Sequence, residues 1–346
     1  MKTALIFGVT GQDGYYLAEL LLSKGYIVYG AKRESSNLDE DLLYLTENKN
    51  LKILDADITN QQEIINLIKK INPDEIYNLA ALSSVKNSFE NPVQTAEINA
   101  LGVLKILEAI RINKLENKTK FYEASTSEML GKPKKSIKIL DTRTELFHPK
   151  SPYGVAKIFG YYITKNYRES YNIFACNGIL FNHESPRRPE TFVTRKITKG
   201  VAKIKLGLQD KLVLGNLDVK RDWGHAKDYV VAMHAILQQD KPGDYIVATG
   251  KEHTLKQFVS YSFKYIGIEI VWSAQGKHTV GKDKKTNKIL VEVDEKYFRP
   301  QDLTPVKADI SKAKRVLKWE ARISLNEIIK EMIDKDLFLL KKENNL

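Results

Sequence analysis

The chain has 346 residues, of which 42% are hydrophobic and 28% charged, a composition that supports a large buried core and excludes a disordered or membrane-spanning protein. This length predicts about two domains. The single cysteine, Cys176, excludes an intramolecular disulfide and a thiolate metal cage, and it fits a reducing, cytoplasmic compartment. The histidines show no pair at helical ligand spacing, so we expect no metal site.

The formal net charge is +12, because 55 Lys and Arg residues outnumber 43 Asp and Glu residues. Such a surplus is compatible with nucleic acid, a membrane surface or an anionic small molecule as partner, or with a solvated surface alone. The basic residues are spread along the chain without a long unbroken block. We therefore favour a solvated surface or an anionic substrate, and expect neither nucleic acid nor membrane as a partner.

Apolar runs alternate with amphipathic stretches through the first half of the chain, which predicts repeated βα units. We expect strands at 3–7, 27–30, 51–55, 75–79, 121–124 and 173–180, and helices at 12–23, 61–70, 95–112 and 152–171. This order predicts an α/β fold of the Rossmann type, a doubly wound parallel sheet. Ligands then bind beyond the carboxyl ends of the strands.

The pattern becomes irregular after residue 180, with an amphipathic stretch at 193–207, helices expected at 225–238, 258–266 and 324–339, and a strand at 245–248. The stretch 212–224 reads as loop, and 274–288 is basic and rich in turn residues. We expect residues 1–180 to form a dinucleotide-binding domain to which 225–249 return. Residues 181–224 and 250–346 are then expected to form a smaller, interleaved C-terminal substrate-binding lobe.

A glycine-rich loop joins the first strand to the first helix. Its glycines permit a tight turn and a close approach to a pyrophosphate, and the helix start supplies partial positive charge. In a βα unit this spacing predicts a dinucleotide site, whereas alone it is a weak signal. The expected contacts from this loop are Gly8, Thr10, Gly11, Gln12, Asp13 and Gly14.

The second strand is followed by Lys32, Arg33, Glu34, Ser35 and Ser36. A site specific for NAD places an acidic residue near this position to accept the ribose 2′-hydroxyl. The basic side chains and the serine hydroxyls favour a 2′-phosphate instead, so we expect NADP. Asp57, after the third apolar run, is a candidate partner for the adenine amine.

Tyr153 and Lys157 are four residues apart in an expected helix, so their side chains share one face. A phenol with a pKa of ~10 is a poor base at neutral pH until a nearby cation stabilises the phenolate. Lys157 provides that cation and can also hold the nicotinamide ribose. The pair predicts a base for removing a hydroxyl proton.

Thr126 and Glu128 follow the fifth expected strand, at the sheet edge where a substrate would lie. Thr126 can hydrogen-bond the hydroxyl that is oxidised. Glu128 supplies a second acid and base, which a simple alcohol dehydrogenase does not need. A dehydratase does need it, to remove a proton next to a ketone and to protonate a departing hydroxyl. The alternative for Glu128 is a carboxylate that only stabilises a helix start.

With these residues the chain resembles the extended short-chain dehydrogenase/reductase family, and within it the GDP-mannose 4,6-dehydratases. The glycine loop, Ser125–Glu128 and Tyr153 with Lys157 are shared with the wider family. The more specific motifs are NGILFNHESPRR at 177–188, TFVTRKI at 191–197, LGNLDVKRDWGHAKDY at 214–229, VEVD at 291–294 and YFRP at 297–300. The resemblance covers nearly the whole chain.

The resemblance implies conversion of GDP-mannose to GDP-4-keto-6-deoxymannose with NADP as a tightly held cofactor, in a homodimer or homotetramer. It implies that Thr126, Glu128, Tyr153 and Lys157 are catalytic. It adds as cofactor contacts Ile58, Leu79, Ala80, Ala81, Ser83, His183 and Arg188. It implies as substrate contacts Ser83, Lys86, Thr126, Asn182, Val193, Lys196, Leu214, Gly215, Lys220, Arg221, Arg299 and Asp302, and arginines suit the diphosphate.

Several positions depart from the family's pattern: Glu34, Leu130, Pro189 and Asp302 replace other residues, and three extra residues separate Thr126 from Tyr153. Because several of these border the expected sugar pocket, another GDP-sugar such as a GDP-manno-heptose is the alternative substrate. An epimerase or 4-reductase of the same fold would need no carboxylate at Glu128. A non-catalytic dinucleotide-binding protein would need none of the four catalytic side chains.

Overall fold

A computed structural model describes residues 1–131, 139–140, 147–274, 276–297 and 307–346. The chain divides into two compact units. Unit 1 comprises Met1–Phe181, Ala226–Ala248 and Ala308–Glu320, and unit 2 comprises Asn182–His225, Thr249–Lys307 and Ala321–Leu346. Each unit is described by itself.

Unit 1 is built on a seven-stranded sheet with the order β11-β7-β5-β4-β1-β2-β3. All neighbouring strands are parallel. The strands are β1 (Thr3–Phe7), β2 (Ile27–Lys32), β3 (Leu51–Asp55), β4 (Glu75–Asn78), β5 (Lys120–Thr126), β7 (Ala175–Leu180) and β11 (Asp244–Val247). The order reverses between β1 and β4, so the loops that leave these two strands diverge and form the topological switch point where such sheets bind ligands.

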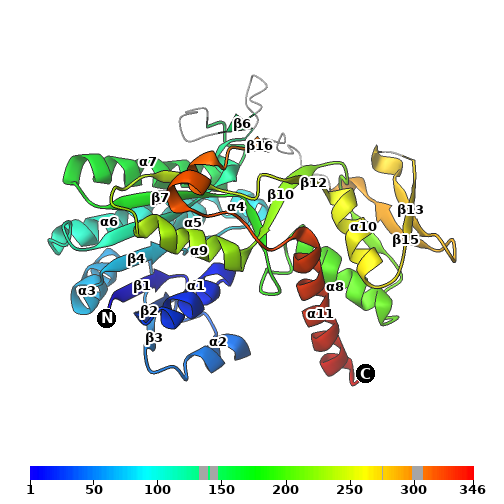
Figure 1. The fold of residues 1–346 in the computed structure, drawn as a ribbon, viewed down its shortest axis with the longest axis horizontal. Coiled ribbons are helices and arrows are strands. Elements are labelled where there is room, and N and C mark those ends of the chain that lie inside the picture. Colours follow the sequence, from blue (N-terminus) through cyan, green and yellow to red (C-terminus); the bar gives the residue numbers. More distant parts are fainter. Residues whose placement is uncertain (132–138, 141–146, 275, 298–306) are drawn as a thin grey trace. The chain divides into compact units, whose positions relative to one another are not determined.

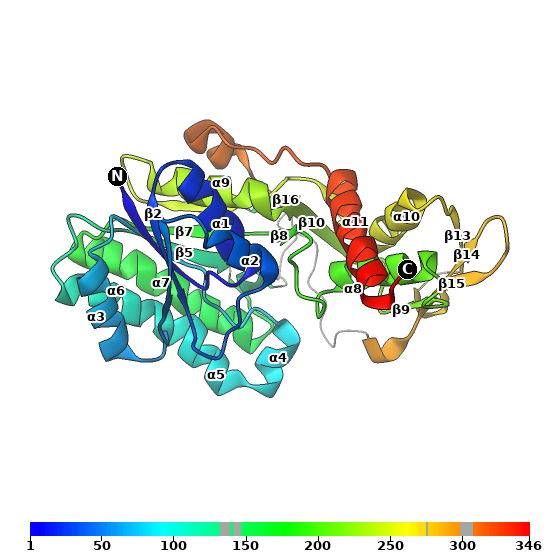
Figure 2. The same cartoon turned by 90° about the horizontal axis from the view of Figure 1, so that it is seen from below.

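Helices cover both faces of this sheet (Figures 1 and 2). On one face α1 (Gln12–Ser23) packs beside α9 (Ala226–Leu237), and on the other α3 (Gln61–Ile71), α6 (Gly102–Ile112) and α7 (Pro152–Tyr171) pack side by side. The second face buries an apolar core in which Leu5, Phe7, Ile76 and Phe121 from the strands meet α3 and α6. The fold class expected from the sequence is therefore confirmed: unit 1 is a Rossmann-type doubly wound sheet.

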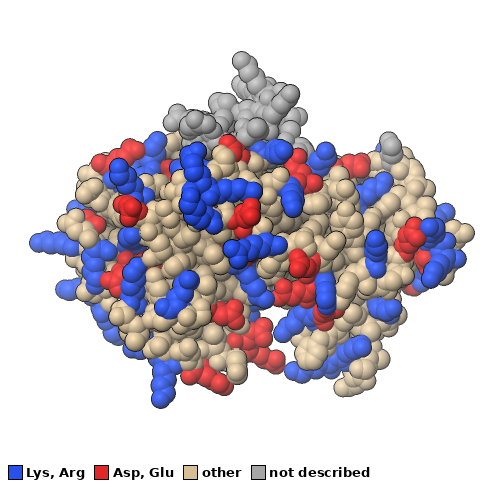
Figure 3. All heavy atoms as spheres, viewed as in Figure 1, with Lys and Arg blue, Asp and Glu red and all other residues tan. Residues whose placement is uncertain are grey.

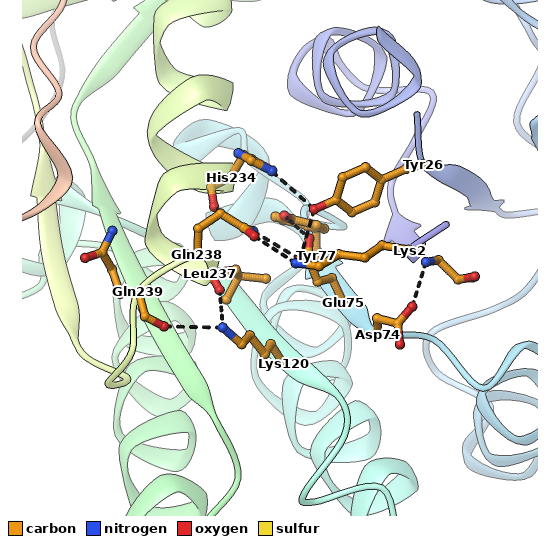
Figure 4. Close-up of polar contacts among 11 residues, drawn as sticks. Lys2, Tyr26, Asp74, Glu75, Tyr77, Lys120, His234, Leu237, Gln238 and Gln239 are labelled. Atoms are coloured by element: carbon orange, nitrogen blue, oxygen red, sulfur yellow. Dashed lines mark hydrogen bonds and ion pairs between the residues drawn. The ribbon is translucent and has the colours of Figure 1, made fainter. Parts of the chain in front are cut away.

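The amino end of this sheet is closed by a buried polar network around Glu75, the first residue of β4 (Figure 4). Glu75 accepts hydrogen bonds from Lys2 Nζ at 3.0 Å, Tyr26 OH at 3.1 Å, Tyr77 OH at 2.8 Å and Gln238 Nε2 at 3.0 Å. Lys120, the first residue of β5, donates to the backbone oxygen of Leu237 at 2.7 Å. These bonds tie the end of α9 to β1, β4 and β5.

Unit 2 contains a three-stranded sheet of β8 (Asn182–Glu184), β10 (Lys220–His225) and β12 (Glu252–Thr254). Its four-stranded sheet has the order β13-β14-β15-β9, from β13 (Ile270–Ser273), β14 (Val280–Asp283), β15 (Ile289–Val293) and β9 (Leu212–Leu214). The helices are α8 (Val193–Lys205), α10 (Leu255–Tyr265) and α11 (Leu325–Asn344), whose apolar faces share one core that includes Ile197, Phe258 and Ile329.

The remaining elements are short: α2 (Glu40–Leu45), α4 (Val85–Glu90), α5 (Pro92–Ala96), the π-helical turns η1 (Glu97–Leu101) and η5 (Ala313–Leu317), and single 3₁₀ turns η2 (Ser127–Met129), η3 (Gly276–His278) and η4 (Glu295–Tyr297). The two-residue strands β6 (Ile139–Leu140) and β16 (Lys307–Ala308) pair with each other. None of the described helices has both the length and the hydropathy needed to span a bilayer. On the face in Figure 3, Lys and Arg side chains are scattered among acidic and uncharged ones.

The structure differs from the expected elements in several places. The single helix expected at 95–112 is α5, η1 and α6 in succession, because Asn99 in the π-helical turn is bonded to the loop after β4. The stretch 212–224, expected as loop, contains β9 and β10, and the turn-rich stretch 274–288 contains β14. The helix α2 was not expected. Short strands of polar sequence, such as β10, lack the alternating pattern that predicts a strand.

The boundary expected for the second lobe is also corrected in one place. Residues 250–346 were all expected in that lobe, yet Ala308–Glu320 belongs to unit 1. Trp319 Nε1 donates to the backbone oxygen of Asp228 in α9 at 2.9 Å. Lys312 Nζ donates to the backbone oxygen of Asp244 in β11 at 2.7 Å and lies 4.5 Å from the Tyr245 ring centroid. These contacts pack the segment against α9 and β11.

Candidate active site

The glycine loop leaves β1 at the switch point and packs directly against the loop that follows β4. Gly8 has a positive φ of +84°, and a Cβ there would lie 2.8 Å from the backbone nitrogen of Ala80. A Cβ at Gly14 would lie 2.3 Å from the carbonyl oxygen of Gly8, so α1 begins against the loop itself. Gly11 is the N-cap of α1 and makes no side-chain cap. This leaves the helix start open to an anionic ligand.

The loop after β4 carries the expected contacts Leu79, Ala80, Ala81 and Ser83. Asn99, which is fully buried in η1, fixes this loop from below. Its Oδ1 accepts from the Leu82 amide at 2.9 Å and its Nδ2 donates to the Leu82 carbonyl at 3.0 Å. Ser83 and Lys86 are exposed, and Lys86 lies 3.9 Å from Glu90. Sequence analysis missed Asn99, whose signal is a polar residue inside an apolar helical stretch.

Of the two basic residues at the end of β2, Lys32 and Arg33, one is available to a ligand. Lys32 Nζ pairs with Asp55 Oδ1 at 2.5 Å, so its charge is already balanced. Arg33 is exposed, and among the described residues no side chain pairs with its guanidinium. The Ser36 amide donates to the Arg33 carbonyl at 2.9 Å, which closes a turn containing Ser35. Arg33 is therefore the basic group available to a ligand here.

Asp57 lies two residues beyond the end of β3. Its Oδ1 accepts from the amide and the hydroxyl of Thr59, at 2.9 Å and 2.8 Å, which forms an Asx turn. Ile58 is buried and packs against Gly102 at the start of α6. This turn directs the chain away from the sheet edge and leaves Asp57 exposed.

Thr126 is the last residue of β5, and Glu128 lies in the 3₁₀ turn that follows. The Glu128 amide donates to Thr126 Oγ1 at 3.2 Å, so this hydroxyl caps the turn. Gly154 in α7 approaches closely, because a Cβ there would lie 2.9 Å from the carbonyl oxygen of Glu128. The half-buried Glu128 therefore lies beside the first turn of the helix that carries Tyr153.

The helix α7 begins at Pro152, as expected, with Ser151 Oγ accepting from the Gly154 amide at 3.1 Å. Tyr153 and Lys157 are on successive turns and both are buried. Lys157 Nζ donates to the Ala124 carbonyl at 2.8 Å and to Glu123 Oε1 at 3.0 Å. Burial lowers the pKa of Lys157, but the charges of Glu123 and Tyr153 outweigh it and raise that pKa above its ordinary value.

The expected contacts His183 and Arg188, with the substrate contacts Asn182 and Val193, lie in unit 2. His183 is buried in β8 next to Glu184, and Glu184 Oε2 lies 3.1 Å from Arg188 Nε. The Arg188 guanidinium also stacks on the Phe192 ring, 3.7 Å from its centroid. Val193, at the start of α8, is exposed.

A second group of expected substrate contacts surrounds the end of β9. Lys196 Nζ donates to the Val213 carbonyl at 2.7 Å and lies 4.0 Å from the Tyr297 ring centroid. Gly215 follows the buried Leu214, and a Cβ at Gly215 would lie 2.5 Å from the Tyr297 carbonyl oxygen. The backbone of this turn therefore packs directly against the backbone of Tyr297. Lys196, Leu214 and Gly215 are thus brought together.

Lys220 and Arg221 begin β10, and Asp222 follows them. Lys220 is exposed, and Arg221 Nη1 donates to its carbonyl at 2.8 Å. The buried Asp222 accepts from the amides of Thr249 and Gly250, at 3.0 Å and 2.7 Å. Burial raises the pKa of Asp222. Arg299 and Asp302 lie outside the described residues.

Sequence analysis assigned no role to Glu123, which is fully buried within β5. Its Oε2 accepts from Asn78 Nδ2 at 2.6 Å while its Oε1 accepts from Lys157. The signal was an acidic residue inside a strand expected to be buried, directly before Ala124-Ser125-Thr126. The structure therefore brings Glu123, Lys157 and Tyr153 together next to Thr126 and Glu128.

The fold and this site define the class as a short-chain dehydrogenase/reductase-like Rossmann protein. Similar solved folds include UDP-glucose 4-epimerase from Thermotoga maritima, with a TM-score of 0.80, 23% identity and coverage of 98% of this chain and 99% of that one. RMD from Pseudomonas aeruginosa, solved in complex with NADPH, has a TM-score of 0.77, 19% identity and coverage of 98% and 100%. At these identities the likeness concerns the fold alone.

Sequence comparison identifies the family more closely. The family model described as GDP-mannose 4,6 dehydratase matches residues 5–332. The GDP-mannose 4,6-dehydratase of Yersinia enterocolitica is 50% identical over 97% of this chain and 94% of that protein. The human GDP-mannose 4,6 dehydratase is 47% identical over 99% and 94%. This chain belongs to the GDP-mannose 4,6-dehydratase family, which confirms the resemblance found in its motifs.

Proposed function

We propose that this protein is an NADP-dependent GDP-mannose 4,6-dehydratase, a hydro-lyase that converts GDP-mannose to GDP-4-keto-6-deoxymannose and water. The observation that carries the proposal is the placement of two acid–base groups at one sheet edge. Tyr153 and Lys157 lie in α7, while Thr126 and Glu128 lie at the end of β5, and the Glu128 carbonyl packs against Gly154. A dehydrogenase alone would not need the carboxylate of Glu128.

The residues at the switch point fit a dinucleotide. The open start of α1 and the crowded backbone around Gly8 and Gly14 suit a pyrophosphate, which needs close backbone approach and N–H donors. The exposed Arg33 suits a 2′-phosphate, which a planar guanidinium can bind in a bidentate manner. Asp57 is then available to the adenine amine. We propose NADP on this basis.

Oxidation at C4 of the sugar begins the sequence of steps. When bound, NADP would supply the hydride acceptor for C4 and the hydride donor for C6. Tyr153, as its phenolate, removes the proton of the 4-hydroxyl, and the neighbouring Lys157 ammonium stabilises that phenolate. Thr126 Oγ1 hydrogen-bonds the same hydroxyl and so orients it toward Tyr153.

Elimination follows, because the new C4 ketone acidifies the hydrogen on C5. Glu128 removes this proton and delivers it to the C6 hydroxyl, which departs as water. Return of the hydride to C6 would be accompanied by uptake of one solvent proton at C5, and Tyr153 would release to solvent the proton that it took from O4. The product is the substrate minus one water, so the oxidation level of the cofactor is unchanged overall.

Residues of unit 2 are proposed to bind the substrate. Arg221 and Arg299 are proposed to contact the diphosphate, and Lys196, Asn182 and Lys220 other polar groups of the GDP-sugar. His183 and Arg188 are proposed as cofactor contacts. The remaining assignments to the substrate in unit 2 are Val193, Leu214, Gly215 and Asp302, and those in unit 1 are Ser83 and Lys86. The chemistry agrees, since cationic side chains suit phosphate oxygens.

We also propose that the protein is a homodimer or homotetramer. Val155, Phe159 and Tyr162 expose apolar surface at successive turns of α7 and form a stripe suited to a two-fold partner. Sedimentation at micromolar concentration should show at least a dimer. A monomer alone would contradict this assignment.

Mass spectrometry of purified protein incubated with nucleotide sugars tests the function. GDP-mannose should lose one water without net accumulation of NADPH and without an added oxidant. A GDP-manno-heptose is the competing substrate, and its conversion in preference to GDP-mannose would revise the sugar but keep the reaction. NADPH accumulating in step with product would contradict a dehydratase and indicate a simple dehydrogenase.

A further inference from the structure

Glu123 and Lys157 form a fully desolvated ion pair directly behind the proposed base. Their side chains are 0% and 2% exposed, and Glu123 Oε1 lies 3.0 Å from Lys157 Nζ. The other carboxylate oxygen accepts from Asn78 Nδ2 at 2.6 Å. Each carboxylate oxygen thus has one donor, and the carboxylate position is fixed from β4 on one side and from α7 on the other.

The ammonium has three N–H groups, of which Glu123 takes one and the Ala124 carbonyl another. One N–H therefore remains for a ligand or for Tyr153, one turn earlier in α7. Gly160 in α7 lies next to the pair, since a Cβ there would make an ordinary contact of 3.6 Å with Glu123 Oε1. The ion pair therefore fixes the position of the Lys157 ammonium group, while α7 fixes the position of its backbone.

Among the titratable groups of the described residues, Glu123 is the carboxylate whose charge acts on Lys157. Tyr153, in the same helix α7, also raises the pKa of Lys157 through its charge. Tyr122, beside Glu123 in β5, has a pKa raised well above its ordinary value by burial, and the charges of Asp13 in α1 and Glu123 raise it further. Burial also raises the pKa of Cys176 to about 12. Tyr122 and Cys176 therefore stay neutral.

We propose that Glu123 is a positioning residue that keeps Lys157 protonated and aimed at Tyr153 across neutral and alkaline pH. Without a counter-charge, a buried lysine loses its proton readily, and its pKa can fall by several units. Lys157 would then lose both the charge that stabilises the Tyr153 phenolate and a donor for the cofactor. This inference rests on the proposed function, whose acid–base pair it deepens.

Glu123→Gln separates charge from geometry. A Gln carbonyl can still accept from Lys157, and the new amide can donate to Asn78 Oδ1 once the Asn78 amide turns over. Asn78 Oδ1 is buried and has no hydrogen-bond partner among the described residues, and after the turn Asn78 Nδ2 would take its place. The matched control is Glu75→Gln, which removes another buried carboxylate from the neighbouring strand and lies in the network of Figure 4.

The first measurement is the rate of NADPH formation in a single turnover, from about pH 7 to about pH 9.5. The wild-type protein and Glu75→Gln should rise to a plateau as Tyr153 ionises. Glu123→Gln should instead fall at the alkaline end, by about tenfold for each pH unit beyond the lowered pKa of Lys157. The second measurement is NADPH affinity by fluorescence titration, which should weaken at alkaline pH in Glu123→Gln alone.

Glu123→Asp keeps the charge on a shorter side chain and should retain the plateau, which keeps the proposal testable if Glu123→Gln does not fold. A uniform loss at every pH in Glu123→Gln, or an alkaline fall in Glu123→Asp, would overturn the proposal. If wild-type protein does not act on GDP-mannose, the proposed function fails, while the NADPH titration still tests Glu123. Normal turnover with pH-independent NADPH affinity in Glu123→Gln would refute only this inference.

Discussion

Glu75 and Glu123 are buried carboxylates on neighbouring strands of one sheet, at 1% and 0% exposure, yet they lie in different chemical settings. Glu75 begins β4, and its donors are Lys2, Tyr26, Tyr77 and Gln238. Glu123 lies near the carboxyl end of β5 and holds Lys157, one turn from Tyr153. Burial and charge alone therefore do not mark a residue that acts on the reaction. Glu75 and Glu123 differ in the groups that donate hydrogen bonds to them and in the end of the sheet at which they lie.

In the described part of the chain, the donors and acceptors of the amino-end network bond to one another. It anchors α9 to the strands through Gln238 and His234, and His234 Nε2 lies 3.3 Å from Tyr26 OH. At the carboxyl end, one N–H group of the Lys157 ammonium makes no hydrogen bond within the described residues. The start of α1, which follows the glycine loop, has no side-chain cap. The comparison predicts that substitutions at the carboxyl end change the reaction, whereas those at the amino end change stability.

The largest effect should come from the two proposed acid–base groups, which act at different steps. Tyr153→Phe should block hydride transfer, whereas Glu128→Gln should permit it and then stall before water is lost. Each group contributes ~10²–10⁴-fold to rate, so both losses should be large. In a single turnover Glu128→Gln should accumulate enzyme-bound NADPH absorbance and Tyr153→Phe almost none. Tyr26→Phe, at the amino end, is the matched control and should turn over normally.

Near wild-type dehydration by Glu128→Gln would show that Glu128 only stabilises the start of a turn. Normal NADPH formation by Tyr153→Phe would remove Tyr153 as the base. A loss of turnover in Tyr26→Phe that matched Tyr153→Phe would remove the contrast between the two ends of the sheet.

A smaller effect is expected at the end of β2, on cofactor choice. Arg33→Ala should weaken NADP by roughly tenfold and NAD much less, since only NADP offers a phosphate to the guanidinium. Lys32→Ala is the control, because Lys32 is paired with Asp55 and should not discriminate. Dissociation constants for both cofactors measure the difference. Equal losses for NADP and NAD in Arg33→Ala would show that another group reads the phosphate.

The smallest effect concerns acid stability at the amino end. Burial lowers the pKa of His234 from 6.5 to about 4, so the unfolded chain binds a proton there before the folded protein does. His234 therefore contributes stability above pH 6.5 that is lost as the pH falls toward 4. His234→Gln should reduce the drop in Tm between pH 6.5 and about pH 4 by ~2–4 °C.

The exposed His278 provides the comparison for that experiment. His278→Gln should leave the dependence of Tm on pH unchanged, and neither substitution should alter turnover at neutral pH. An unchanged pH dependence in His234→Gln would show that its protonation is not linked to unfolding.

The sequence predicted the elements whose periodicity is strong. The strands at 3–7 and 51–55 and the helices at 12–23 and 152–171 have the predicted bounds. The π-helical turn Glu97–Leu101 was missed because it depends on Asn99 meeting Leu82, a contact that no local pattern contains. The strands β9 and β10 were missed because they are short and their pairing partners are distant in sequence.

The candidate site was predicted as residue types but not as contacts. Tyr153, Lys157, Thr126 and Glu128 followed from spacing and from their place after expected strands. The Glu123–Lys157 pair could not follow, because residues 34 positions apart meet only when α7 packs across β5. Likewise, the pairing of Lys32 with Asp55 depends on the register of β2 and β3, which leaves Arg33 as the available cation.

The most direct test of the central claim follows the hydrogen on C4 of the sugar. GDP-mannose carrying deuterium at C4 is incubated with the purified protein, and the product is analysed by mass spectrometry and NMR. An internal hydride transfer predicts a product that has lost one water and carries the deuterium at C6. Deuterium found in the free cofactor or in solvent, with none at C6, would contradict a 4,6-dehydratase that uses Tyr153 and Glu128 in one site.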